Sequence, residues 1–304
     1  MINFEKILVC VDLSSAGQSI IGKACSIAKK AKTKEVAFLY VVKEFNFPES
    51  LQEEFPDLLT KAMDERKNEL KTLINEAFTC SDEVETKLII KQGNLTKEIL
   101  TTSAEEDSDL IVIGRKQDSD SILNTRIARR AACNLMIVPR SDHELAFDRI
   151  HVPVDFSNYT SMSLDTALTL SEDRNSEIFL HNVYTVPSSY RYSGKTFEEF
   201  AAILEEHTVR DLEKLTRKVT VKDQKLTTIH SVDNGQSVID IIYDAAKNEK
   251  ADIIVMGAKG RTAASALFIG SKAERMIQVN ENIPLLVVRP KGSNAGILES
   301  LQEI

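Results

Sequence analysis

The sequence predicts an α/β protein of two tandem domains, each an open parallel sheet flanked by helices in the Rossmann-like manner. Three observations predict this fold class. Short runs of Val, Ile and Leu alternate along the chain with longer segments of helical periodicity. Strand-like segments of the first half recur in the second half. Each first strand ends in Asp, at the sheet edge where open α/β sheets bind ligands.

The internal repeat sets the domain organisation. Three pairs of segments match, two of them at an offset of 143 residues: residues 6–14 with 149–157, 109–114 with 252–257, and 135–138 with 285–288. A chain of 304 residues has the length of about two ordinary domains. We expect domains at residues 1–141 and 147–290, a polar linker at 141–145 and a polar tail over 291–304.

Five apolar segments of the second copy predict strands. They lie at residues 149–154, 178–183, 226–232, 252–256 and 285–289. Continuous Val, Ile and Leu runs are typical of strands buried on both faces of a parallel sheet. Right-handed crossovers then place the carboxyl ends of all five strands at one edge. Asp155 and Gly257 follow two of these strands, so both are expected at that edge.

Helical segments connect the predicted strands. In the second copy they lie at Ser163–Leu170, Thr196–Val219, Ser237–Asn248 and Lys272–Val279, and in the first copy one lies at Leu123–Ala131. Residues 126–130 of that helix are basic, which is typical of a solvated helix face. The long connections at 45–56 and 186–197 contain Phe, Tyr and Pro. We expect them to cover sheet edges; the alternatives are that they cover a pocket or form a partner surface.

Composition limits the classes of function. The net charge of −8 argues against a general nucleic-acid or anionic-membrane surface, since such binding needs clustered Lys and Arg. No apolar stretch is long enough to cross a bilayer, and residues 1–7 show no secretory signal. The cysteines form no C-x-x-C pair, which indicates reduced thiols in a cytoplasmic protein: Cys10, Cys25, Cys80 and Cys133. The five histidines show no metal-ligand spacing, so we expect no metal site in the protein itself.

Residues 257–271, GAKGRTAASALFIGS, carry the main functional signal. The chain has only eleven glycines, and three of them fall here between a strand and a helix. Glycine lets the backbone adopt positive φ and bring N–H groups close to a ligand. The helix start near Ser271 favours an anion such as phosphate. We expect a phosphate-binding loop; the alternative is a turn that only lets the helix pack on the sheet.

Together these features resemble the universal stress protein family in its tandem, two-domain form. The family's signature after the fourth strand, G-x2-G-x9-G-[ST], is satisfied by Gly257, Gly260, Gly270 and Ser271. Further matches lie at the ends of the first, second and fifth strands: Val154-Asp155 and Val11-Asp12, residues 180–183 and residues 284–288. The resemblance covers nearly all of residues 1–290.

The resemblance implies five parallel strands per domain, in the adenine nucleotide alpha hydrolase-like group of folds. It implies pairing of the two domains through their fifth strands, and ATP binding in members with the full glycine signature. For this chain we expect an adenine nucleotide as partner, no nucleic acid and no membrane. Whether two chains form a homodimer stays open.

The implied ATP site lies in the second domain. Its residues are Pro153, Val154, Asp155, Val183, Met256, Gly257, Lys259, Gly260, Arg261, Gly270, Ser271 and Lys272. The glycine loop would hold the phosphates with backbone N–H groups, and the Ser271 hydroxyl would donate a further hydrogen bond. Asp155 would accept from the ribose hydroxyls, and the Val183 backbone would meet the adenine edge. A divalent metal such as Mg²⁺ would be held mainly by the phosphates.

Several of these residues have simpler interpretations. Asp155 can cap the next helix near Ser157, and Ser271 can be an N-cap. Lys259 and Arg261 can offset phosphate charge with Lys272, or can be solvated loop charges. As a lone histidine in a strand pattern, His181 is interpreted as structural. We expect no catalytic residue in this site.

The first copy lacks the glycine signature. Its equivalent loop begins at Gly114, with Gln117 in place of the second glycine, and it is about half as long. Asp118 and Asp120 would oppose an anion there. We expect the first domain not to bind ATP in the family's manner; the alternative is a reshaped site for another ligand.

These features favour a cytoplasmic nucleotide-binding regulator of the stress response, acting through conformation or partner binding. One alternative is a partner-binding scaffold in which nucleotide is incidental. Another is an enzyme, either a slow ATPase or an adenylating enzyme. A dehydrogenase and a P-loop ATPase are disfavoured, because G-x-G-x-x-G does not follow either first strand and G-x-x-x-x-G-K-[ST] is absent.

Overall fold

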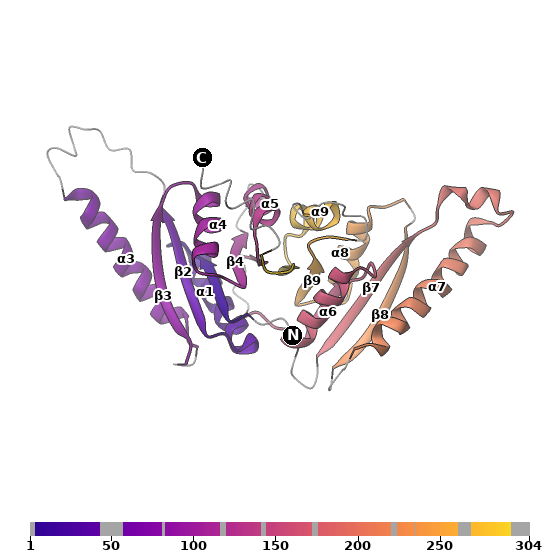
Figure 1. The fold of residues 1–304 in the computed structure, drawn as a ribbon, viewed down its shortest axis with the longest axis horizontal. Helices are drawn as coiled ribbons and strands as arrows, with labels where there is room; N and C mark the ends of the chain where they lie inside the picture. Colours follow the sequence, from indigo (N-terminus) through magenta and orange to yellow (C-terminus); the bar gives the residue numbers. More distant parts are fainter. Residues whose placement is uncertain are drawn as a thin grey trace. The chain divides into compact units, whose positions relative to one another are not determined.

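A computed structural model describes most of the chain (Figure 1). The described residues are 4–42, 57–80, 83–115, 120–140, 144–171, 176–219, 224–233, 235–260 and 269–292. They form two compact units, with the boundary between Leu145 and Ala146. Each unit is a parallel sheet flanked by helices, which confirms the predicted fold class. The predicted tail lies outside the described residues, apart from the first two of its positions.

The first unit contains five parallel strands in the order β3-β2-β1-β4-β5. Their bounds are β1 Lys6–Cys10, β2 Glu35–Val42, β3 Glu85–Gln92, β4 Leu110–Arg115 and β5 Asn134–Pro139. Four described helices connect them: α1 Ser15–Ala31, α3 Leu58–Ala77, α4 Leu95–Glu105 and α5 Asp120–Arg130. Arg126 and Arg129 of α5 are exposed, as expected for a solvated basic face.

The second unit repeats this topology with the order β10-β9-β6-β7-β8. Its strands are β6 Arg149–Pro153, β7 Glu177–Thr185, β8 Lys225–Asp233, β9 Ile253–Gly257 and β10 Leu285–Val288. Its helices are α6 Asn158–Leu170, η1 Ser188–Tyr192, α7 Phe197–Arg217, α8 Val238–Asn248 and α9 Ser271–Val279. All five predicted strands and all four predicted helices of the second copy are present.

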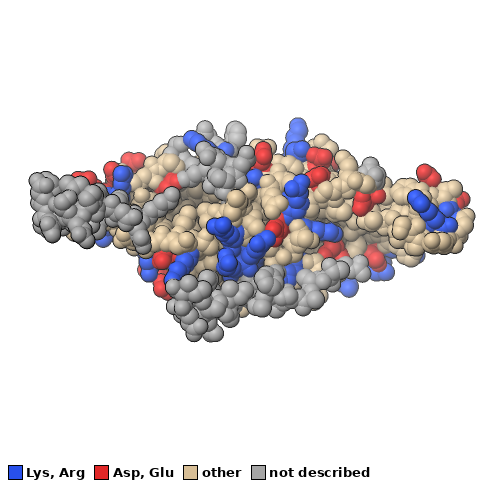
Figure 2. Space-filling view, turned by 90° about the horizontal axis from the view of Figure 1, so that it is seen from above, with Lys and Arg blue, Asp and Glu red and all other residues tan. Residues whose placement is uncertain are grey.

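Strands β4 and β5 of the first unit and β9 and β10 of the second are buried on both faces. Every residue of β5 and β10 is buried, as are the first four residues of β4 and β9. These strands are rich in Val, Ile, Leu and Met, the composition of a sheet covered by helices on two sides. In Figure 2 Lys and Arg occur together with Asp and Glu over both units on the face shown, so that surface has mixed charge.

One helix begins earlier than predicted. The sequence predicts a start at Ser163, but α6 begins at Asn158, with Ser157 as its N-cap. The Ser157 hydroxyl accepts a hydrogen bond from the Thr160 N–H at 3.4 Å. The first turn is mostly polar, so hydrophobic periodicity does not show it. Helix α5 likewise begins three residues before the predicted Leu123.

The strand order of the second unit creates a crevice at one edge of its sheet. Strand β6 lies between β7, which follows it in the chain, and β9, which comes two crossovers later. Loops leaving β6 and β9 therefore diverge at their carboxyl ends, as at the ligand sites of other open α/β sheets. Asp155 and Gly257 lie at this edge, as the sequence predicts.

The described helices lack the features of a membrane span. Over the ranges given above, no helix combines the length and the apolar composition needed to cross a bilayer.

Candidate functional site

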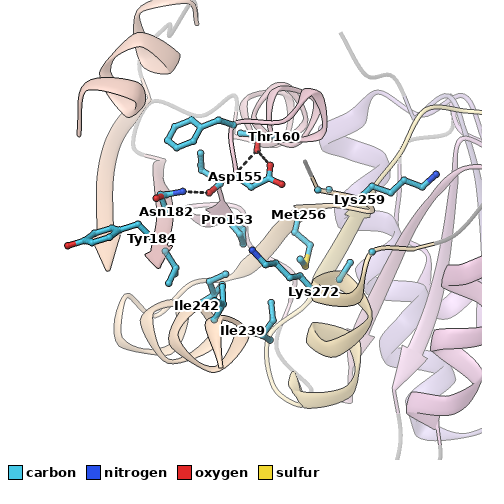
Figure 3. Close-up of a pocket in the computed structure, with 18 of the residues that line it drawn as sticks. Pro153, Asp155, Thr160, Asn182, Tyr184, Ile239, Ile242, Met256, Lys259 and Lys272 are labelled. Carbon is cyan, nitrogen blue, oxygen red and sulfur yellow. Dashed lines mark hydrogen bonds between the residues drawn. The ribbon is translucent and has the colours of Figure 1, made fainter. Parts of the chain in front are cut away.

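A cavity of about 1030 Å³ opens at the carboxyl edge of the second unit's sheet (Figure 3). Its size suits a ligand as large as a nucleotide. Eleven of the twelve predicted site residues line it: Pro153, Val154, Asp155, Val183, Met256, Gly257, Lys259, Gly260, Gly270, Ser271 and Lys272. The twelfth, Arg261, lies outside the described residues. The fold thus brings residues from both ends of the domain into one cavity.

Asp155 has a capping role that is built into the fold. Its Oδ1 accepts hydrogen bonds from Ser157 N–H at 3.0 Å, Ser157 Oγ at 2.6 Å and Thr160 Oγ1 at 2.8 Å. The alternative interpretation, that Asp155 caps the next helix, is therefore correct for this oxygen. A Cβ built on Gly260 would lie 2.6 Å from the other oxygen, Oδ2. That oxygen faces the glycine loop, so capping and ligand contact can use different atoms of one carboxylate.

Two glycines of the loop, Gly257 and Gly260, are needed for close approach. A Cβ on Gly257 would lie 2.5 Å from the Cβ of Tyr159, and one on Gly260 would meet Asp155. Neither residue, nor Gly270, has the positive φ that the sequence led us to expect. The loop is instead drawn tightly against α6 and the β6 end, with Gly270 N–H donating to the Ala258 carbonyl at 2.7 Å. At Gly257 and Gly260 this packing leaves no room for a Cβ, whereas a Cβ on Gly270 would meet its neighbours at 3.4 Å or more, an ordinary contact distance.

Two helices begin at the cavity without a side-chain cap. Helix α9 has Gly270 as its N-cap, so Ser271 is its first helical residue and the alternative that Ser271 is the N-cap is wrong. Helix α8 has Ser237 as its N-cap, and this hydroxyl makes no capping hydrogen bond. Val238 and Ser271, at the two helix starts, line the cavity. Uncapped helix starts present N–H groups and a positive dipole end, which favour a bound anion.

The two described lysines of the site differ in direction. The Lys272 side chain reaches toward Pro153 across the cavity, whereas the Lys259 side chain points away (Figure 3). Burial and repulsion from Arg289 lower the pKa of Lys259. A cation held near a second cation is stabilised by a nearby anion. Because its side chain reaches into the cavity, Lys272 is the better placed of the two to meet a ligand there.

The cavity has an apolar side that the sequence pattern largely did not reveal. Ile239 and Ile242 of α8 lie there with Pro153, Val183 and Met256. Both isoleucines are buried, at 3% and 4% exposure. Their i, i+3 spacing just after a helix start was the available signal, but it equally describes an ordinary core face. Apolar surfaces of this kind suit the uncharged part of a ligand.

Asn182 is a second residue that the sequence did not single out. Its Nδ2 donates to the Val154 carbonyl at 2.7 Å, and its Oδ1 lies 3.5 Å from the Thr208 hydroxyl of α7. It thereby fixes the end of β6 against β7, immediately before Asp155. Only the tertiary contact reveals this role, because a single Asn in a strand has no distinctive pattern.

His181 has no part in the cavity lining and supports the sheet. Its Nδ1 lies 3.2 Å from His151 Nε2, and its Nε2 lies 2.9 Å from Ser231 Oγ. Burial, with repulsion from the neighbouring histidine, lowers the pKa of His151 to about 3. Burial, with repulsion from His230, lowers the pKa of His181 to about 4. Both rings are therefore neutral at pH 7, in line with a structural interpretation.

The first unit keeps the capping aspartate but has a much shorter loop. Asp12 Oδ1 accepts from Ser14 N–H at 3.0 Å and from Ser14 Oγ at 2.5 Å, as Asp155 does from Ser157. Only residues 116–119 separate β4 from α5, whereas residues 258–270 separate β9 from α9. The four connecting residues, with Gln117 and Asp118, lie outside the described residues. This connection is too short to reproduce the loop of the second unit.

The residues of the cavity do not form a metal site of their own. No cluster of three His, Cys, Asp or Glu side chains suited to a metal ion occurs in the part of the chain that the structure describes. The carboxylates lining the cavity are Asp155 and Asp211, on different elements.

Comparison with known proteins identifies relatives of both units. The Universal stress protein family matches residues 3–139 and 146–289. Universal stress protein MJ0531 of Methanocaldococcus jannaschii is 26% identical over 147 residues, 48% of this chain and 84% of that protein. Universal stress protein YxiE of Bacillus subtilis is 23% identical over 151 residues, 47% of this chain and 99% of that protein. Each of these relatives is as long as about one of the two units.

A solved structure resembles the whole chain. The crystal structure of a universal stress protein from Archaeoglobus fulgidus covers 96% of this chain and 99% of its own, with a TM-score of 0.64 and 17% identity. At this identity the likeness shows the fold, with two domains in one chain. It confirms the tandem α/β architecture predicted from the repeat.

Proposed function

The chain belongs to the universal stress protein family, and from this premise we propose that it is a cytoplasmic ATP-binding regulator of the stress response. One ATP would be held per chain, by the second domain. The single observation that carries the proposal is the cavity in which the glycine loop, the Asp155 carboxylate and an apolar side meet. The sequence contains no C-x-x-C pair, which agrees with a reducing compartment.

Each part of the cavity suits one part of ATP. Ile239, Ile242 and Met256 would cover the adenine, with the Val183 backbone at its edge. Asp155 Oδ2 would accept from the ribose hydroxyls, while Oδ1 keeps its capping bonds. The loop from Gly257 to Gly260 and the start of α9 would hold the phosphates. Lys272 would add a charge-assisted contact, and Mg²⁺, where present, would be bound by the phosphates.

Regulation would follow from ligand-dependent stability. A ligand at a hundred times its dissociation constant stabilises the form that binds it by about 2.7 kcal/mol. That is enough to change the population of one conformation or partner surface. We further propose that the domains pair through their fifth strands, β5 and β10, and that the first domain serves this pairing without binding ATP. A homodimer would contain two chains that are each paired internally in this way.

Ligand analysis of the purified protein tests the proposal. Mass spectrometry of material released by denaturation should find an adenine nucleotide, and calorimetric titration should give one ATP per chain with micromolar or better affinity. GTP should bind more weakly, because guanine presents a different pattern of donors and acceptors to the Val183 backbone at the base edge. Failure to copurify with ATP, together with no binding at micromolar concentrations, would contradict the proposal. Release of AMP and pyrophosphate with a cosubstrate would favour an adenylating enzyme instead.

Asp155→Ala is expected to reduce both stability and ATP affinity. Loss of the acceptor for three donors should lower the free energy of unfolding by about 1–2 kcal/mol. Loss of the ribose acceptor should raise the dissociation constant for ATP by about tenfold or more. Asp12→Ala is the matched control, because Asp12 caps its helix in the same way in the first unit. Urea unfolding and calorimetry should show a stability loss without an affinity loss in that control; equal ATP affinity in both variants would remove Asp155 from the site.

Gly270→Val distinguishes a nucleotide-dependent regulator from a partner-binding scaffold in which nucleotide is incidental. The added side chain would start 3.4 Å from the Ala258 carbonyl and grow into the phosphate region. ATP binding should be lost, and with it the protein's contribution to survival under stress. If a cell carrying the variant survives stress as well as the wild type, the scaffold with incidental nucleotide is the better description.

A further inference from the structure

Two cysteines that are far apart in the sequence meet in the first unit. Cys25 lies within α1, and Cys80 lies three residues after α3. Their sulfur atoms are 2.7 Å apart, although the two residues are 55 positions apart in the sequence. The Cys80 thiol also lies 3.3 Å from the Cys25 carbonyl oxygen. No disulfide joins the two residues in the structure, so the contact is between two thiols.

The surrounding packing fixes this contact. Helices α1 and α3 pack together. Phe78, the residue after α3, donates its N–H to the Ile74 carbonyl at 2.8 Å. The Phe78 ring meets the fully buried Phe38 ring edge to face, with centroids 5.3 Å apart. The chain is thus anchored two residues before Cys80, which holds its sulfur beside Cys25.

The two thiols differ in exposure. Cys25 is buried, at 4% exposure, whereas Cys80 is only partly buried. A small oxidant therefore reaches Cys80 first, and Cys25 waits behind it as the second thiol. The other two cysteines lie in different surroundings. Burial raises the pKa of the Cys10 thiol far above its ordinary value, and Cys133 is buried against the Ser103 hydroxyl.

We propose that Cys25 and Cys80 form a redox-active dithiol that a peroxide converts to an intrachain disulfide. The Cys80 thiol gives up its proton, and the thiolate attacks one oxygen of hydrogen peroxide. The O–O bond breaks, hydroxide leaves and takes up that proton as the first water, and Cys80 becomes a sulfenic acid. The Cys25 thiolate then attacks the Cys80 sulfur, the S–O bond breaks, and hydroxide leaves to take up a proton as the second water. Two thiols lose two electrons in total, and the peroxide gains them.

The disulfide would act on the first domain alone. It would tie α1 to the segment after α3, closing a loop that spans most of two crossovers. Such a cross-link restricts the unfolded chain and stabilises the folded domain. The second domain has no cysteine, so its ATP site would not be modified directly. The proposal is independent of ATP binding and holds whether or not the second domain binds a nucleotide.

Thiol counting on the full-length protein tests the proposal. The reduced protein should carry four reactive thiols in denaturant, and after treatment with hydrogen peroxide it should carry two. A digest without reductant should contain one cross-linked pair of peptides, with Cys25 and Cys80, and dithiothreitol should separate them. The thermal midpoint of the oxidised first domain should rise by roughly 5–10 °C. Cross-links to Cys10 or Cys133, links between chains, or four remaining thiols would each overturn the proposal.

Single substitutions supply the controls. Cys80→Ser should abolish both the cross-link and the rise in the midpoint, and it changes a partly exposed side chain that the fold should tolerate. Cys25→Ser should likewise abolish the cross-link, because it removes the other thiol of the pair. Cys10→Ser removes one thiol outside the pair, so it should leave the Cys25–Cys80 cross-link and the rise unchanged. A cross-link that survives Cys80→Ser, or disappears in Cys10→Ser, would also overturn the assignment.

Discussion

Gly260→Ala is expected to weaken ATP binding by about 10–100-fold, the range that corresponds to losing charge-assisted hydrogen bonds. The added methyl group would lie 2.6 Å from Asp155 Oδ2, which is closer than real contacts allow. The carboxylate cannot swing aside cheaply, because its Oδ1 accepts three hydrogen bonds at the start of α6. Either the loop or Asp155 must move, and both belong to the proposed site.

Gly22→Ala is the matched control for this substitution. Gly22 lies within α1, and a Cβ built there meets nothing within 4 Å. Alanine should stabilise that helix by about 0.5–1 kcal/mol and leave ATP affinity unchanged. Isothermal titration of the three proteins, with circular dichroism to verify folding, gives the comparison. If Gly260→Ala binds ATP as tightly as the wild type, the loop does not hold the nucleotide in the proposed way.

The buried pair His151 and His181 should make the second domain sensitive to acid. Their pKa values in the folded protein are lowered to about 3 and about 4, below the value of 6.5 for an unperturbed histidine. Below pH 6.5 the unfolded chain therefore binds more protons than the folded chain. The stability that depends on the two neutral rings is fully present above pH 6.5. It is lost progressively as the pH falls from 6.5 toward the folded pKa values of about 4 and about 3. We expect a loss of about 3–6 kcal/mol between pH 7 and pH 4.

The residues at the equivalent positions of the first unit suggest a variant that tests whether the two histidines cause this pH dependence. Leu8 and Leu39 occupy the same register positions in β1 and β2 as the two histidines in β6 and β7. Both leucines are buried, at 0% and 1% exposure. The double variant His151→Leu, His181→Leu should flatten the pH dependence, and it also removes His151 Nδ1, a buried atom without a hydrogen-bond partner. Urea unfolding followed by circular dichroism, from pH 7 to pH 4, measures the effect; an unchanged pH dependence would exclude the pair as its cause.

Sequence patterns located the strands well because a strand buried on both faces is apolar along most of its length, and such a run is visible in the local sequence. Runs such as residues 253–256 are apolar throughout, and the repeat confirms them by appearing twice. The start of α6 was missed because its first turn is stabilised by Asp155 and Ser157 through polar capping bonds. Such bonds leave no hydrophobic period, so the predicted helix begins only where the apolar face begins.

The site was predicted unevenly for a related reason. Gly257, Gly260 and Gly270 were found because their spacing is conspicuous in a chain with few glycines. Ile239 and Asn182 were missed because their types and spacings are ordinary. Their importance comes from the strand order, which places β6 between β7 and β9 and lets α8 begin at the same edge.

By itself the sequence determined the two-domain α/β architecture, the family resemblance and the difference between the two glycine loops. These depend on local composition, spacing and repetition along the chain. Only the tertiary structure decided that Gly257 and Gly260 are required by close approach to Tyr159 and Asp155 and not by positive φ, and that Cys25 meets Cys80. Those contacts join residues 55 to about a hundred positions apart, and their partners are set by the order of strands and the packing of helices, which no local pattern records.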